Sequence, residues 1–65
     1  MTSSDHAELS ALATAIGDLS ERVAEMAERF QTDDNRTDAA TALFEAERSL
    51  HMGLRHVDRA VRALS

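Results

Sequence analysis

The chain contains no cysteine, so disulfide bridges, thiolate metal sites and thiol nucleophiles are excluded. It also lacks proline, tryptophan and tyrosine, and its only glycines are Gly17 and Gly53. Strands and tight turns are rich in aromatic, β-branched and glycine residues, whereas 12 of the 65 residues here are alanine, the strongest helix former. The composition therefore predicts an all-α protein.

Lysine is absent too, so the seven basic residues are all arginine, and 12 acidic residues bring the net charge to −5. Nucleic-acid binding depends on a positive surface, so we expect no nucleic-acid partner. No apolar run approaches the roughly 18 residues that a membrane span needs. The N-terminal residues also lack a signal-peptide pattern. We therefore expect a cytoplasmic protein without membrane contact.

Apolar residues in the first half recur at alternating spacings of three and four, which is the heptad pattern of one helix face. Asp5 and Glu8 have the spacing of a capping box, with Ser3 and Ser4 as alternative N-caps. These signals predict a helix over 5–31. The seam residues are Leu9, Leu12, Ile16, Leu19, Val23, Met26 and Phe30.

The polar stretch 32–37 is rich in residues whose side chains compete for backbone hydrogen bonds. The apolar seam that follows is displaced by three positions from the first, which favours a turn over one continuous helix. We expect Asn35 to adopt the left-handed conformation and Thr37 or Asp38 to cap a second helix over 38–64. The second seam consists of Ala40, Leu43, Leu50, Leu54, Val57, Val61 and Leu64.

Two helices of similar length joined by a short turn predict an antiparallel helical hairpin that forms a single domain over 1–65. Two helices touch along one line, but these seams are wider, so one hairpin leaves apolar surface uncovered. A chain this short usually needs a staple or a partner. We therefore expect a homodimeric four-helix bundle, with another helical protein as the alternative partner. The predicted interface comprises the residues of both seams except Ala40, together with Phe44 and Glu47.

Glu47 interrupts the second seam, and a buried carboxylate is costly unless it is paired or protonated. His51 follows one turn later on the same helix face. Glu47 and His51 are the candidate metal or small-ligand site, to which a two-fold copy would add a second pair. The structural alternative is a polar pair that fixes the register of the helices. The Glu-x-x-His spacing of di-iron bundles does not occur, and we expect no cofactor.

Small residues occur once per heptad beside the second seam, at Ala39, Ala46, Gly53 and Ala60. Small side chains let helix backbones approach closely, so we expect this row to face the first helix. The alternative is a groove for a partner helix, gripped by Met52.

Arg48, Arg55 and Arg62 form a second row on this helix, with Arg59 nearby. Such a row usually forms a solvated face, and a surface that binds phosphate or an acidic partner is the alternative. The serine, histidine and aspartate residues lie on helices without a nucleophile elbow. The sequence therefore predicts a small non-enzymatic interaction or assembly module. The alternative is a ligand-binding bundle.

Overall fold

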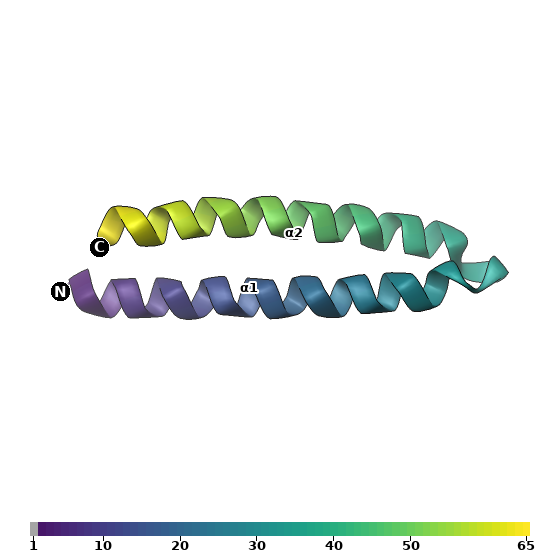
Figure 1. The fold of residues 1–65 in the computed structure, drawn as a ribbon, viewed down its shortest axis with the longest axis horizontal. Coiled ribbons are helices and arrows are strands. Elements are labelled where there is room, and N and C mark those ends of the chain that lie inside the picture. The colour runs from purple at the N-terminus through teal and green to yellow at the C-terminus, as the bar shows by residue number, and fades with distance from the viewer. Residues whose placement is uncertain (1) are drawn as a thin grey trace.

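A computed structural model describes residues 2–65 and shows two long helices folded back on each other (Figure 1). Helix α1 spans Thr2–Gln31, the short 3-10 helix η1 spans Asp34–Arg36, and helix α2 spans Thr37–Leu64. Both ends of the chain lie at the same end of the hairpin, with the turn at the other (Figure 1). The predicted all-α class and antiparallel hairpin are confirmed.

Helix α1 begins before the predicted capping box. Asp5 lies inside its first turn, and Ser3 and Ser4 are helical as well, so the prediction that one of these residues caps the helix is wrong. No proline or glycine precedes Asp5 to stop the helix from extending. The Asp5 carboxylate still acts favourably on the helix dipole from the first turn.

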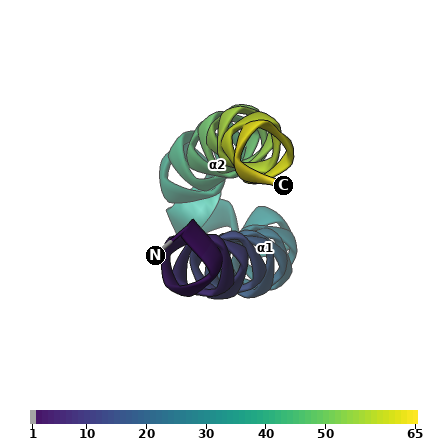
Figure 2. The ribbon, with the colours of Figure 1, turned by 90° about the vertical axis from the view of Figure 1, so that its left-hand side faces the viewer.

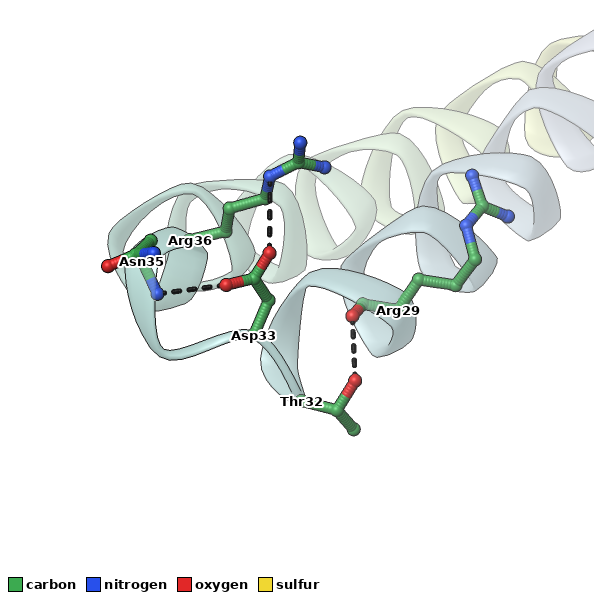
Figure 3. Close-up of polar contacts among 5 residues, drawn as sticks. All are labelled: Arg29, Thr32, Asp33, Asn35 and Arg36. Carbon is green, nitrogen blue, oxygen red and sulfur yellow. Dashed lines mark hydrogen bonds and ion pairs between the residues drawn. The ribbon is translucent and has the colours of Figure 1, made fainter.

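Asp33 organises the turn between the helices (Figure 3). Its backbone is extended, and its Oδ1 atom accepts a hydrogen bond from the Asn35 N–H at 3.0 Å. Its Oδ2 atom lies 3.4 Å from Nε of Arg36, whose guanidinium sits 5.0 Å from the centre of the Phe30 ring. One side chain thus caps η1 at its start and pairs with its last residue.

The turn differs from the sequence prediction in two respects. Asn35 is not left-handed, since no residue in the described range 2–65 has a positive φ. Thr37 is the first residue of α2, and Arg36 occupies the N-cap without a side-chain cap bond, so neither Thr37 nor Asp38 is the cap. The hydrogen bond that Oδ1 of Asp33 accepts from the Asn35 N–H stabilises a turn that contains no left-handed residue.

The hairpin is a single layer of helices. Its radius of gyration is 15.0 Å, whereas a compact chain of this length would have about 11 Å. The Cα trace measures 51 × 14 × 10 Å, and the end-on view shows the two long helices side by side (Figure 2). Both sides of this layer therefore face solvent in the isolated chain.

The contact between the helices is built on small residues. Ser20 and Ala27 of α1 and Ala40 of α2 are the fully buried residues of the described chain. A Cβ atom placed on Gly17 would lie 3.9 Å from Cδ2 of Leu54, so Gly17 and Leu54 are neighbours across the hairpin. Small side chains on α1 thus allow the larger apolar residues of α2 to pack close to its backbone.

Candidate functional site

The first apolar seam is divided between two environments. Leu12, Leu19 and Met26 are 52%, 49% and 40% exposed, and we call this row the ridge. The other four seam residues are half-buried along the contact with α2. They are Leu9, Ile16, Val23 and Phe30. Because α1 turns its small residues toward α2, the ridge is rotated out of the hairpin.

The second seam is used mainly within the hairpin. Phe44 and Glu47 are half-buried beside it, and Leu64 at the C-terminal end is exposed. The remaining residues of the predicted α2 interface are also half-buried. They are Leu43, Leu50, Leu54, Val57 and Val61. The predicted interface residues of α2 therefore mostly contact α1 of the same chain, and the ridge of α1 is left without a partner.

The small row of α2, defined as Ala39, Ala46, Gly53 and Ala60, does not face α1. The three alanines are exposed, and a Cβ atom placed on Gly53 would meet no atom within 4 Å. The prediction that this row packs closely inside the hairpin is wrong. The small residues that serve that purpose are on α1, where Gly17, Ser20 and Ala27 line the contact.

The ridge and the small row lie on the same side of the hairpin. Ser20 and Ala27 of α1 and Ala40 of α2 are buried at the contact, and Leu19, Met26 and Ala39 each come one position earlier. Successive residues turn by about 100° around a helix axis, and the same turn on two antiparallel helices leads to the same side of the hairpin. Together the ridge and the small row form one exposed apolar surface, which we call the ridge face.

The two rows are also level with each other along the hairpin. Because Gly17 lies beside Leu54, each step back along α1 matches a step forward along antiparallel α2. Leu19 is then level with Met52, which is one residue from Gly53. Leu12 and Met26 likewise lie within one residue of the heights of Ala60 and Ala46. Each large exposed side chain of α1 is therefore next to a small residue of α2.

Glu47 and His51 form a local pair on the opposite side from the ridge face. The Nε2 atom of His51 lies 2.9 Å from Oε2 of Glu47, one turn earlier on α2. The Glu47 side chain is largely covered, whereas that of His51 is exposed. Within residues 2–65 no group of three histidine, cysteine or acidic residues lies close enough to hold a metal ion. The pair thus supplies two possible metal ligands, and His51 gives the half-buried Glu47 carboxylate a polar partner.

Three of the four arginines singled out in the sequence line a shallow depression on α2. Arg55, Arg59 and Arg62 surround it together with Asp58, and Arg48 lies one heptad before Arg55. None of these arginines lies within 4.0 Å of a carboxylate in the part of the chain that the structure describes. All are exposed, which fits a solvated surface.

Ser20 is buried in the contact between the two helices. Its side chain is 2% exposed, and its Oγ atom has no hydrogen-bond partner. A serine in a helix commonly bonds to the carbonyl four residues earlier, as Thr14 does with Ser10 at 3.2 Å. The hydroxyl of Ser20 is held between the helices by packing alone, so the site is a structural contact.

Over residues 2–65, neither helix combines enough length with enough apolar character to span a membrane. The chain matches no protein-family model, and comparison with curated proteins and with solved structures finds no significant match.

Proposed function

We propose that this chain is a small, cytoplasmic, non-enzymatic interaction module that assembles as a homodimeric four-helix bundle. The observation that carries the proposal is the ridge, three large apolar side chains in heptad register on the surface of a hairpin one helix thick. Heptad rows of this kind are the usual contacts between helices of a bundle.

The area of the hairpin supports this assembly. The isolated chain exposes 4974 Å², about 900 Å² more than a compact monomer of its mass. A standard protein–protein interface removes about 800 Å² from each partner. Burying one side of the hairpin against a second copy would therefore return the exposed area to the range of a compact domain.

The polar contacts also favour assembly over ligand binding. Glu47 pairs with His51, and Asp33 pairs with Arg36, so the carboxylates that are partly covered already have local partners. Because Glu47 and His51 lie away from the ridge face, a copy docked on that face brings no second pair to them. The ligand-binding alternative thus rests on two polar side chains on one helix turn. Within residues 2–65, no third histidine or acidic residue lies close enough to complete a metal site with them.

Sedimentation equilibrium at high micromolar concentration tests the proposal. The wild-type chain should sediment as a species of twice 7.1 kDa. Leu19→Glu should shift it to the monomer, because the charge would be buried at the centre of the ridge. Met52→Glu is the matched control, since Met52 is 55% exposed, close to the 49% of Leu19, but points away from the ridge face. A monomeric wild type, or equal effects of the two variants, would overturn the proposal.

Leu19→Glu could also unfold a chain that depends on the dimer, so a second variant is needed. Gly53→Leu adds a side chain at a position where the Cβ atom would meet nothing of α1 within 4 Å, so the variant leaves the contact inside the hairpin unchanged. It should weaken dimerisation while circular dichroism remains helical. Unchanged dimerisation would show that the ridge face is not the contact.

A further inference from the structure

We infer that two copies dock ridge face to ridge face, with the ridge of each chain seated on the small row of the other, around a two-fold axis parallel to the helices. This arrangement rests on the proposed self-association and specifies its geometry. It makes the first helix of one chain an antiparallel neighbour of the second helix of its partner.

A surface that packs against a copy of itself has two simple two-fold solutions. An axis parallel to the helices places α1 opposite the partner's α2 and brings both turns to the same end. An axis across the helices places α1 opposite the partner's α1, and the turns lie at opposite ends. The side-chain sizes on the ridge face distinguish the two.

With the parallel axis, every residue keeps its height along the bundle. Because Leu19 and Gly53 differ in height by only one residue within one chain, about 1.5 Å, Leu19 of each chain lies close to Gly53 of the other. The remaining contacts pair Leu12 with Ala60 and Met26 with Ala46. Three large side chains thus meet three small ones at each of two equivalent contacts, which is the size complementarity of interlocked helices.

With the crossed axis, the ridge would meet the partner's ridge, and the small row would meet the partner's small row. Leu19 would lie against a second leucine, and Gly53 would lie near a second glycine with no side chain between them. The large ridge side chains would hold the two α1 helices apart, whereas the small rows would require the two α2 helices to approach more closely. Two rigid hairpins cannot satisfy both distances without tilting, and voids between helices are costly.

The open space at Gly53 supports the same arrangement. A glycine inside a helix costs about 1 kcal/mol relative to alanine, and nothing within the hairpin uses the space that it leaves. A partner's Leu19 fills that space in the parallel arrangement. In this arrangement Gly53 packs closely against a first helix, as the sequence predicts, but that helix belongs to the partner chain.

Single cysteines test the arrangement directly, because the natural chain has none. Leu19→Cys and Gly53→Cys chains are mixed, unfolded, refolded together and equilibrated in a glutathione redox buffer. The parallel arrangement predicts that the mixed disulfide exceeds each self-paired disulfide by about tenfold or more, against about twofold for random pairing. Met52→Cys mixed with Leu19→Cys is the control, and it should give no excess of the mixed product.

The outcomes separate the geometry from the self-association. Self-paired Leu19→Cys as the main product would overturn the parallel axis and indicate the crossed one. Random proportions, or no cross-linking, in a sample that sediments as a dimer would overturn the ridge-to-row contact while leaving dimerisation intact. Reduced variants that sediment as monomers, together with a monomeric wild type, would overturn the proposed function itself.

Discussion

Gly17 lies directly beside Leu54 across the hairpin, with Cδ2 of the leucine 3.9 Å from the position of an added Cβ atom. The relationship sets the register of the two helices, and it places the ridge and the small row at matching heights to within one residue. It also defines the space available at Gly17, because 3.9 Å is an ordinary van der Waals distance. A methyl group therefore fits at this position without moving its neighbour.

Gly17→Ala should raise the free energy of unfolding by about 1 kcal/mol, because alanine is the better helix former and the site is not crowded. Urea denaturation at fixed protein concentration measures the change. Gly53→Ala is the matched comparison. It should gain less, since its methyl group would occupy the seat proposed for the partner's leucine. A loss of stability in Gly17→Ala would show that the helices pack closer than the structure indicates.

Asp33→Ala should lower the free energy of unfolding by about 1 kcal/mol, because the cap on the Asn35 N–H is lost. Asp33→Asn keeps an oxygen acceptor and removes only the exposed ion pair with Arg36, which contributes less than about 0.5 kcal/mol. Thermal melting monitored by circular dichroism compares the two variants. Equal losses would mean that the ion pair, and not the cap, stabilises the turn.

Glu47→Leu should keep the dimer and raise the melting temperature. The pair with His51 is partly exposed and contributes about 0.5 kcal/mol, whereas covering a leucine in this half-buried seam position stabilises by about 1.5 kcal/mol. Calorimetry measures the melting temperature, and titration with Zn²⁺ tests the alternative role. Zinc binding by the wild type that disappears in Glu47→Leu would support a metal site at Glu47 and His51.

The sequence predicts the two helices and the hairpin because their signals are local. Heptad spacing, a polar interval and a shift in seam phase can be read without knowing how the helices pack. The rotation of each helix about its axis cannot be read in this way. Helix α1 has an apolar row at Leu12, Leu19 and Met26 and a small row that includes Ser20 and Ala27, and either row can face a partner.

The structure resolves that choice through the sizes of the side chains on both helices. The leucines and valines of α2 pack closest when they meet the small row of α1, so the ridge turns outward. The same reasoning explains the error at Gly53, which was expected to face the first helix. At the turn, the sequence predicts the polar interval but assigns the main role to a left-handed Asn35. In the structure, Oδ1 of Asp33, two residues earlier, accepts a hydrogen bond from the Asn35 N–H.

The dependence of unfolding on protein concentration tests self-association most directly. A chain that is folded as a dimer and unfolded as a monomer gains about 1.4 kcal/mol of stability for each tenfold increase in concentration. For two chains of this length, that gain raises the melting temperature by about 5 °C. A melting temperature that rises by this amount between low and high micromolar samples would support the account. One that stays constant would contradict it.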